Sequence, residues 1–461
     1  MELINKPLAE AMLRIPFHVR FAVACTAGLL VALRPLPASA FRIELPEAVG
    51  RALTQGGKSR RALLATERAS HEAQGMRSEF RPRLSVSSGA GYSSRQTEKL
   101  RAVDGRGVER VYGLASLGSR EGWFNVFAEQ LLFDLRRSKQ IEAADLAVEV
   151  TKAVEAQERQ AVALEVFELY TDVLRLDERL RMSRQVASRA KALAELASSL
   201  AAAGAALDVD REDARIAAQR AALAVEDLER RRAIAQQSLA AAIGAGNADL
   251  PEPVAGSLPA VGDGEVTEVD DRLLAETPEL RALEARRRLE HARVEAAHAT
   301  RLPTVGVQGG YSHYGTNRYD NFPDEWRIGV DVRVPLFDGG KTRHETAAAR
   351  NDEQIATIQY ELALARKRRL VGELRARLAA AGRQEELAAS SAANAQRRLD
   401  LVEMRLRAKR GGVLEVVSAL DRYRAASAAA IDARFERLRA WARLESELAR
   451  LVSKLLPEAS E

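Results

Sequence analysis

The stretch with the strictest alternation spans residues 326–336 and reads WRIGVDVRVPL. Apolar side chains occupy every second position from Trp326 to Leu336, and arginine, glycine, aspartate or proline fills the positions between them. Because successive side chains of a β-strand point to opposite faces, this pattern predicts a strand with one apolar face and one wet face. Its length of about ten residues is what a tilted strand needs to cross a membrane.

Three further strands are predicted from the same alternation. One precedes the first at residues 304–314, and two lie earlier in the chain, at residues 84–92 and 124–132, where the pattern is less regular. The polar, glycine-containing segments 94–121 and 315–325 connect the strands of each pair. We expect these segments to be loops that face the cell exterior.

The chain carries one unit twice. The motif LFD at 132–134 recurs at 336–338, RPRLSV at 81–86 resembles RLPTVGV at 301–307, and GAALDV at 204–209 resembles GGVLEV at 411–416. Three matches in the same order indicate a duplication, in which each unit reads helix, strand, strand, long helix, turn, helix. The expected parts are a first repeat at 41–243, an equatorial linker rich in proline and glycine at 244–269, a second repeat at 270–456 and a short tail at 457–461.

Two long helices are predicted, one after each pair of strands. They span roughly residues 135–203 and 341–410, and at about 1.5 Å per residue each reaches about 100 Å. Leucine and valine recur there in steps of three and four, as on the buried face of a packed helix. The shorter helical stretches of each repeat together have about the same length, so we expect two short helices to stack end to end along one long helix. All the helices would then form one wall.

The first forty residues are typical of a secretory signal peptide. Lys6, Arg14 and Arg20 come first and are followed by an uncharged run at residues 21–33. The small-residue ending is Ala38-Ser39-Ala40. We expect the mature chain to begin at Phe41 and therefore to lack Cys25, the single cysteine. The alternative is a lipoprotein acylated at Cys25, although the three residues before it match that processing motif poorly.

The charge pattern argues against nucleic acid as a partner. The formal net charge is +5, but lysine and arginine alternate with acids along the helical stretches, as on solvated helix faces. His291 and His298 have no third metal ligand near them, and the chain has no nucleotide-binding loop and no nucleophile motif. We therefore expect no metal site, no cofactor and no enzyme activity.

A sheet of four such strands requires more than one chain. Its edge N–H and C=O groups would be unpaired in hydrocarbon, so a single copy is unstable in a membrane. Closed barrels have at least about eight strands, a number that either two or three copies would satisfy.

The chain resembles the TolC-type outer-membrane efflux proteins. The resemblance rests on the signal peptide, the duplicated unit, the Leu-Pro strand start at 302–303, the strand exit PLFDGG at 335–340 and the Gly-x-x-Leu-acid-Val turns, and it covers nearly the whole mature chain. It implies an α+β membrane protein in which four strands from each copy of a homotrimer form an oligomeric transmembrane β-barrel. The helices would form a long α-helical barrel in the periplasm.

The resemblance also implies partners and a role. The trimer would sit in outer-membrane lipid and dock on an inner-membrane pump through a periplasmic adaptor, or membrane fusion, protein. It would be the exit duct of a tripartite efflux or type I secretion system and would conduct substrates passively. Pro335, Gly339 and Gly340 would form its strand-helix junction.

By the same resemblance, Asp208, Glu415 and Asp421 are candidates for a pore constriction near the periplasmic end of the tunnel. The other interpretation is that an acid in the first turn of a helix complements the helix dipole. Gly204, Gly411 and Gly412 would form hairpin tips that meet the adaptor, or would simply end helices. The nearby Arg407 and Arg410 either pair with these acids or are solvated.

Two alternative functions belong to different classes. A soluble periplasmic coiled-coil adaptor or scaffold explains the helices, but it leaves four alternating strands of membrane length without a purpose. A surface adhesin predicts long repetitive extracellular segments, which the sequence lacks.

Overall fold

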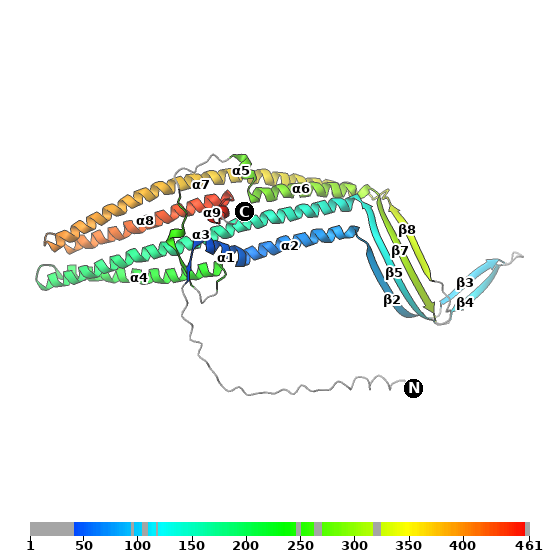
Figure 1. The fold of residues 1–461 in the computed structure, drawn as a ribbon, viewed down its shortest axis with the longest axis horizontal. Coiled ribbons are helices and arrows are strands. Elements are labelled where there is room, and N and C mark those ends of the chain that lie inside the picture. Colours follow the sequence, from blue (N-terminus) through cyan, green and yellow to red (C-terminus); the bar gives the residue numbers. More distant parts are fainter. Residues whose placement is uncertain are drawn as a thin grey trace, which may run out of the picture. The chain divides into compact units, whose positions relative to one another are not determined.

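The computed structural model describes residues 41–93, 96–103, 109–116, 119–245, 250–261, 270–316 and 324–456. The expected signal peptide, the position of Cys25 and the expected tail lie outside the described residues. In the described part, long helices lead directly into a β-sheet (Figure 1). None of the described helices is long and apolar enough to span a membrane.

The sheet has four strands in the order β2-β5-β7-β8, and every neighbouring pair is antiparallel. Their bounds are β2 Arg83–Ser93, β5 Ser119–Asp134, β7 Thr304–Thr316 and β8 Glu325–Arg333. All four predicted strands are confirmed, and each half of the chain supplies two of them. β8 ends before Leu336, because Pro335 has no N–H to offer a neighbouring strand.

The expected first loop contains more structure than predicted. Two strands, β3 (Gln96–Val103) and β4 (Glu109–Ser116), pair antiparallel within residues 94–121, and β5 begins there as well. The prediction of a plain loop was wrong for this segment. Charged residues interrupt the alternation QTEKLRAV and ERVYGLAS, so the period-two signal is too weak to reveal the hairpin.

The helices form a wall built from two similar halves (Figure 1). The long helices α3 and α7 have 68 and 67 residues, α2 and α6 have 21 each, and α4 and α8 have 35 each. These equal lengths support the predicted duplication. The bounds are α2 Gly57–Arg77, α3 Leu135–Ala202, α4 Asp208–Ala242, α6 Pro278–His298, α7 Lys341–Arg407 and α8 Val413–Glu447.

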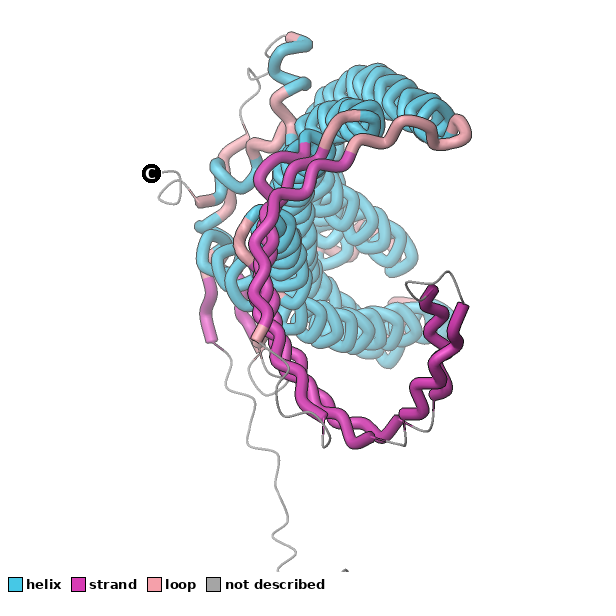
Figure 2. The backbone as a smooth tube through the Cα atoms, turned by 90° about the vertical axis from the view of Figure 1, so that its right-hand side faces the viewer, coloured by secondary structure: helices cyan, strands magenta, loops and turns pink. Residues whose placement is uncertain are grey.

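Short helices stack along long ones, as predicted. α2 and α4 pack on α3, while α6 and α8 pack on α7 and also contact α3. The wall therefore runs from α2 and α4, through α3 and then α6 and α8, to α7, and Figure 2 shows that it is curved. The described part also contains three shorter α-helices, α1 Leu45–Gln55, α5 Asp271–Ala275 and α9 Leu451–Leu455, and three short 3-10 helices.

The described part of the linker packs against the wall. Its strand β6 (Pro251–Pro253) pairs in parallel with β1 (Phe41–Ile43). The buried Tyr170 hydroxyl of α3 accepts a hydrogen bond from the Val254 N–H at 2.8 Å and lies 2.9 Å from the Ile43 carbonyl oxygen. One tyrosine thus joins the start of the first repeat to the linker at the middle of the wall.

The largest core cluster lies where the two repeats meet. Phe167 and Phe435 are fully buried, and the Phe167 ring centroid lies 6.0 Å from that of Trp441. Phe167 belongs to α3, whereas the other two aromatic residues belong to α8. Burial of these large rings makes the contact between α3 and α8 a main source of stability for the wall.

Candidate functional site

One face of the sheet is apolar and exposed. The register aligns Val86, Val126, Tyr311 and Trp326 in one row across the four strands. Ile328, in the middle of β8, is 74% exposed. Further large apolar side chains exposed on this face are Leu84, Tyr92, Phe124, Val330 and Val332. An exposed apolar surface over several neighbouring strands marks a face that contacts lipid or a partner.

The opposite face of the sheet is mainly polar, although Trp123 and Phe127 of β5 also lie on it. Its residues form rows across neighbouring strands, such as Arg83, Glu129 and Gln308, and Ser87, Asn125 and Ser312. A sheet with one apolar and one polar face matches the wall of a barrel that separates lipid from a watery interior.

Trp123 lies on the polar face. It stands three positions from Val126, so its side chain points to the opposite side of β5, and a Cβ on Gly89 would fall 2.2 Å from its ring. The ring thus covers the backbone of β2 where glycine leaves room. Of the other aromatic residues of the sheet, Tyr92, Tyr311 and Trp326 point to the apolar face.

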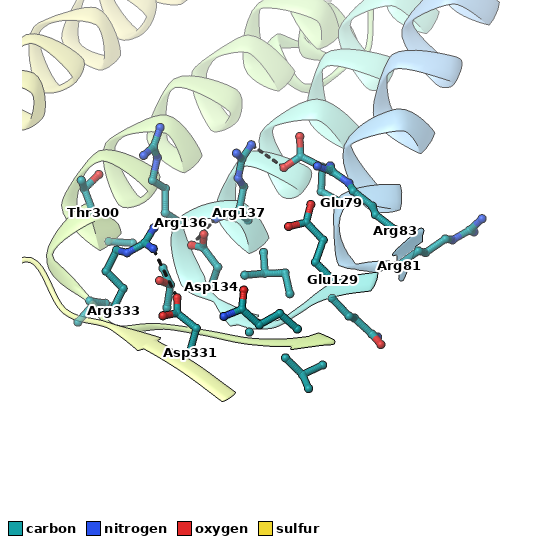
Figure 3. Close-up of a pocket in the computed structure, with 18 of the residues that line it drawn as sticks. Glu79, Arg81, Arg83, Glu129, Asp134, Arg136, Arg137, Thr300, Asp331 and Arg333 are labelled. Carbon is teal, nitrogen blue, oxygen red and sulfur yellow. Dashed lines mark hydrogen bonds and ion pairs between the residues drawn. The ribbon is translucent and has the colours of Figure 1, made fainter. Parts of the chain in front are cut away.

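A charged cavity of about 530 Å³ lies where the polar face meets the helices. Figure 3 shows charged side chains gathered around it, and those from the sheet and from the first turn of α3 include Arg83, Glu129, Arg136, Arg137, Asp331 and Arg333. Arg137 forms an ion pair with Glu79 at 2.5 Å. Charged side chains are costly to remove from water, so this cavity favours water over apolar groups.

The repeated Leu-Phe-Asp motif caps both long helices. The Asp134 carboxylate accepts a hydrogen bond from the Arg137 N–H at 3.0 Å. The Asp338 carboxylate accepts bonds from the N–H groups of Gly340 and Thr342, at 2.9 and 2.8 Å. Free N–H groups at a helix start need such acceptors. The sequence pattern contained this signal, but its capping role was missed.

The second junction contains the predicted glycine turn. Gly339 and Gly340 have φ values of 65° and 87°, which strongly favour glycine. Pro335 lies in the irregular segment between β8 and α7. The first junction has no such turn, since α3 begins directly at Leu135 after β5.

Asp338 makes the second junction sensitive to acid. Hydrogen bonds from the Thr342 side chain, then from the backbone N–H groups of Thr342 and Gly340, lower the pKa of Asp338 to about 2. A lowered pKa stabilises the folded state above the unfolded pKa of about 3.9, and this contribution is lost as the pH falls toward 2.

We therefore expect Asp338→Ala to lower the melting temperature at pH 7. The difference in melting temperature between the variant and the original protein should shrink between about pH 4 and pH 2. Thermal unfolding followed by circular dichroism at each pH measures the effect. Asp352→Ala is the matched control, because it removes an exposed carboxylate from the same helix. A difference that persists unchanged at pH 2 would show that the charge of Asp338 is not the cause.

Both helix hairpins close with the same backbone pattern. In the α3-α4 turn, the Ala205 N–H donates to the Leu200 carbonyl at 2.8 Å, and Gly204 has a φ of 70°. In the α7-α8 turn, the Arg410 N–H donates to the Arg405 carbonyl at 2.8 Å. These are left-handed helix endings that favour glycine.

The left-handed residue of the second turn is Lys409, which has a φ of 57°. Neither of the two predicted glycines adopts this conformation. Gly411 instead allows close packing, since a Cβ there would lie 3.3 Å from the Leu406 nitrogen. Gly412 is extended and precedes α8. Both glycines lie in the turn between α7 and α8, but the left-handed position belongs to Lys409.

The candidate acids take different positions in their helices. Asp208 is the first residue of α4 and pairs with Arg211 at 3.2 Å, whereas Glu415 is the third residue of α8. The structural counterpart of Glu415 is thus Asp210, whose carboxylate accepts a hydrogen bond from the Leu207 N–H at 3.4 Å. GAALDV and GGVLEV therefore resemble each other in sequence, but equivalent letters of the two motifs lie two residues apart when the two hairpins are compared in structure.

Glu415 is exposed, and its side chain has no ion pair or hydrogen bond within the described residues. Asp421, one turn and a half further along α8, pairs with Arg424 at 3.5 Å. Arg407 and Arg410 are exposed as well, and neither pairs with the candidate acids in the described part of the chain. Of the three candidate acids, Glu415 is therefore the one whose charge is not balanced by a paired cation in the described part of the chain.

Sequence reasoning missed a contact that ties the two hairpins together. Arg189 of α3 lies 2.9 Å from Asp400 and 3.5 Å from Glu403 of α7, and its guanidinium lies 5.8 Å from the centre of the Tyr423 ring of α8. The partners are more than 200 positions away along the chain. No local pattern in the sequence could reveal the pairing.

Comparison with known proteins identifies the same architecture. The sequence profile of a family described as "Outer membrane efflux protein" matches residues 52–245 and 270–450. Protein CyaE of Bordetella pertussis is 26% identical over 335 residues, which cover 69% of this chain and 66% of CyaE. The nickel and cobalt resistance protein CnrC of Cupriavidus metallidurans is 33% identical over 89 residues, 19% of each chain. The matches span less than two thirds of either relative.

The fold matches a solved structure over most of both chains. The crystal structure of CusC, a transmembrane channel, superposes with a TM-score of 0.75 at 16% identity and covers 88% of this chain and 92% of CusC. The family profile covers both halves of the helical wall and the sheet strands β2, β5, β7 and β8. The chain belongs to the outer membrane efflux protein family.

Proposed function

We propose that the chain forms, as a homotrimer, the outer-membrane duct of an export system. Three copies would close a β-barrel of twelve strands in the membrane, and their helices would form a tunnel through the periplasm. The observation that carries this proposal is the sheet with one exposed apolar face and one polar face, continuous with a wall of long helices. Membership of an efflux family supports a conduit that performs no chemistry on its substrate.

The open edges of the sheet support closure by neighbouring copies. β2 and β8 are the edge strands of the four-stranded sheet, and the antiparallel order places β8 antiparallel to the β2 of a next copy. The two edges of the helical wall also present apolar residues, with Leu223 of α4 63% exposed and Leu362 of α7 65% exposed. Each copy would therefore use two different surfaces, as in a closed ring.

Glu415 is our proposed constriction residue, with Asp208 and Asp421 as weaker candidates. Three uncompensated carboxylates around one axis attract cations and repel anions. We expect Glu415→Gln to lower the ratio of cation to anion permeability by a factor of about two or more. Single-channel recording in a planar lipid bilayer measures it. Glu386→Gln, an exposed acid in the middle of α7, is the control.

Unchanged selectivity and conductance in Glu415→Gln would contradict the constriction role. The acid would then serve only the dipole at the start of α8. If only Asp421→Asn changed the selectivity, the constriction would be assigned to Asp421, further along the same helix.

The proposed partners are a periplasmic adaptor and an inner-membrane pump. The hairpin tips that contain Gly204 and residues 411–412 are the proposed adaptor contacts, because they end the wall opposite the sheet (Figure 1). In such an assembly the pump selects the substrate, and the duct of the outer membrane passes it on.

Cell fractionation followed by cross-linking tests this proposal against the soluble adaptor alternative. We expect the tagged protein in the outer-membrane fraction as a trimer, and mass spectrometry of its covalent partners should recover an adaptor together with an inner-membrane transporter. A freely soluble periplasmic product would favour the adaptor or scaffold instead.

A further inference from the structure

Two aromatic side chains stand on the mainly polar face of the sheet. Trp123 and Phe127 of β5 are both 38% exposed. The register places Gly89 of β2 beside Trp123, and it places Phe127 between Ser85 of β2 and Gly310 of β7. Neighbours as small as these leave the rings uncovered. The face that lines the interior of the proposed barrel therefore carries an apolar surface of its own.

The Trp123 ring lies along the neighbouring strand. A Cβ on Gly89 would fall 2.2 to 2.8 Å from three atoms of this ring, and a Cβ on Gly91 would fall 3.8 Å from it. The indole therefore extends over two glycines of β2, with one side held near the backbone. Its other side is open to the interior.

The Phe127 ring lies toward the opposite neighbour, β7. A Cβ on Gly310 would fall 3.5 Å from Cδ2 of this ring, so glycine again leaves the room that the ring uses. The two aromatic residues are four positions apart on one strand, which is about 13 Å. Asn125 lies between them on the same face, and its amide donates to the Ser87 hydroxyl at 3.5 Å. Two aromatic surfaces thus follow each other along β5, with an amide between them.

A ring over glycine also has a structural role, because it shields the backbone where glycine has no side chain. This role needs only an apolar cover, which a leucine would supply as well. An open aromatic face offers more, since it attracts other rings by offset stacking beyond the effect of the buried area. The two roles can therefore be separated by substitution.

We propose that Trp123 and Phe127 form a contact surface inside the barrel for planar aromatic molecules, and that the substrates of the duct include compounds with aromatic rings. The inference rests on the proposed function, in which the mainly polar face lines the interior. Three copies would place three such pairs around one passage. Each contact is weak, as conduction requires, because a substrate that enters must also leave.

The neighbouring charges do not select one sign of substrate. Glu129 follows Phe127 on the same face, but Arg83 stands opposite Glu129 in the register. Arg327 lies in the same row as Phe127, on β8, and pairs with Glu325 at 2.8 Å. Acids and bases at neighbouring positions largely cancel each other for a passing ion. A neutral aromatic ring is therefore the probe that reports on the aromatic surface itself.

Current recordings with caffeine test the proposal. Caffeine is a neutral, planar ring system, and glucose is a neutral ring of similar size that is not planar. Each probe is added to single channels of the protein, purified from the outer membrane and inserted into planar lipid bilayers. We expect caffeine to reduce the current at a concentration at least fivefold lower than glucose requires for the same reduction.

Leucine variants separate stacking from packing. The combined substitution W123L and F127L keeps an apolar cover over the glycines and removes both aromatic faces. The caffeine concentration needed for half of the maximal current reduction should rise at least fivefold. Phe124→Leu is the matched control, because it removes a ring from the apolar face of the same strand. It should leave the response to caffeine unchanged.

Fluorescence provides a second measurement that leaves both rings in place. The chain has three tryptophans, of which Trp441 is buried. Trp326→Phe therefore leaves Trp123 as the exposed one. Caffeine stacked on Trp123 should quench its emission in a saturable manner, while the fluorescence lifetime of the remaining emission stays the same.

Equal effects of caffeine and glucose, or an unchanged response to caffeine in the W123L and F127L variant, would overturn the proposal. Quenching that never saturates and shortens the lifetime would also overturn it, because it would show collisions without binding. An equal loss in Phe124→Leu would place the contact on the lipid side. Normal conductance with any of these results defeats this inference alone, whereas absence of conductance in the unaltered protein defeats the proposed duct.

Discussion

Replacing Ile328 with arginine is expected to keep the protein out of the outer membrane. Ile328 lies in the middle of β8, on the apolar face, and is 74% exposed. An arginine near the midplane of a bilayer costs about 2–4 kcal/mol, and every copy in the ring would carry it. The amount of heat-resistant trimer in the outer-membrane fraction should fall to a small share of its original value.

The adjacent residue gives a matched control for this result. A side chain at position 329 would point to the polar face, and a Cβ there would have no atom within 4 Å. Gly329→Arg should therefore assemble normally. If Ile328→Arg assembles as well as the original protein, or if both variants fail equally, the assignment of the lipid-facing side is wrong.

Replacing Phe167 with alanine should destabilise the helical wall by about 3–5 kcal/mol, the range for removing a fully buried aromatic ring. Phe167 of α3 packs near Trp441 of α8, so the cavity would form at the contact between the two repeats. Denaturant unfolding followed by circular dichroism measures the loss.

Phe167→Leu keeps most of the volume and should cost clearly less than the alanine variant. Equal losses in the two variants would mean that the aromatic contact itself, and not the filled volume, stabilises this region. No loss in either variant would contradict the view that the contact of α3 with α8 holds the halves together.

Local patterns predicted most of the fold. The alternation at 326–336 revealed β8, and the uninterrupted helical spacing placed both long helices within three residues of their observed ends. Proline and glycine marked the second junction, because Pro335 and Gly339 constrain the backbone where they occur. The predicted outer-membrane efflux family is confirmed, and with it the location in the outer membrane.

Contacts between distant residues were not predictable from these patterns. Tyr170 joins the linker to β1, and Arg189 joins two hairpins, but neither residue stands in a motif. The tips show a second limit of local similarity. GGVLEV resembles GAALDV, yet Lys409 occupies the left-handed turn position that Gly204 occupies in the first hairpin. Residues that align in sequence therefore have different positions in the two turns.

Cysteines on the two edge strands test the central claim, which is that copies of this chain close the sheet into a barrel. Cysteine is placed at Arg83, Ser85 or Ser87 of β2 in combination with Arg327, Gly329 or Asp331 of β8, all on the polar face. Val86→Cys, on the apolar face, is paired with Gly329→Cys as the control. Oxidation is carried out in intact outer membranes and followed by non-reducing electrophoresis. We predict disulfide-linked trimers for at least one polar-face pair and none for the control, whereas monomers for every pair would contradict a barrel closed by β2 and β8.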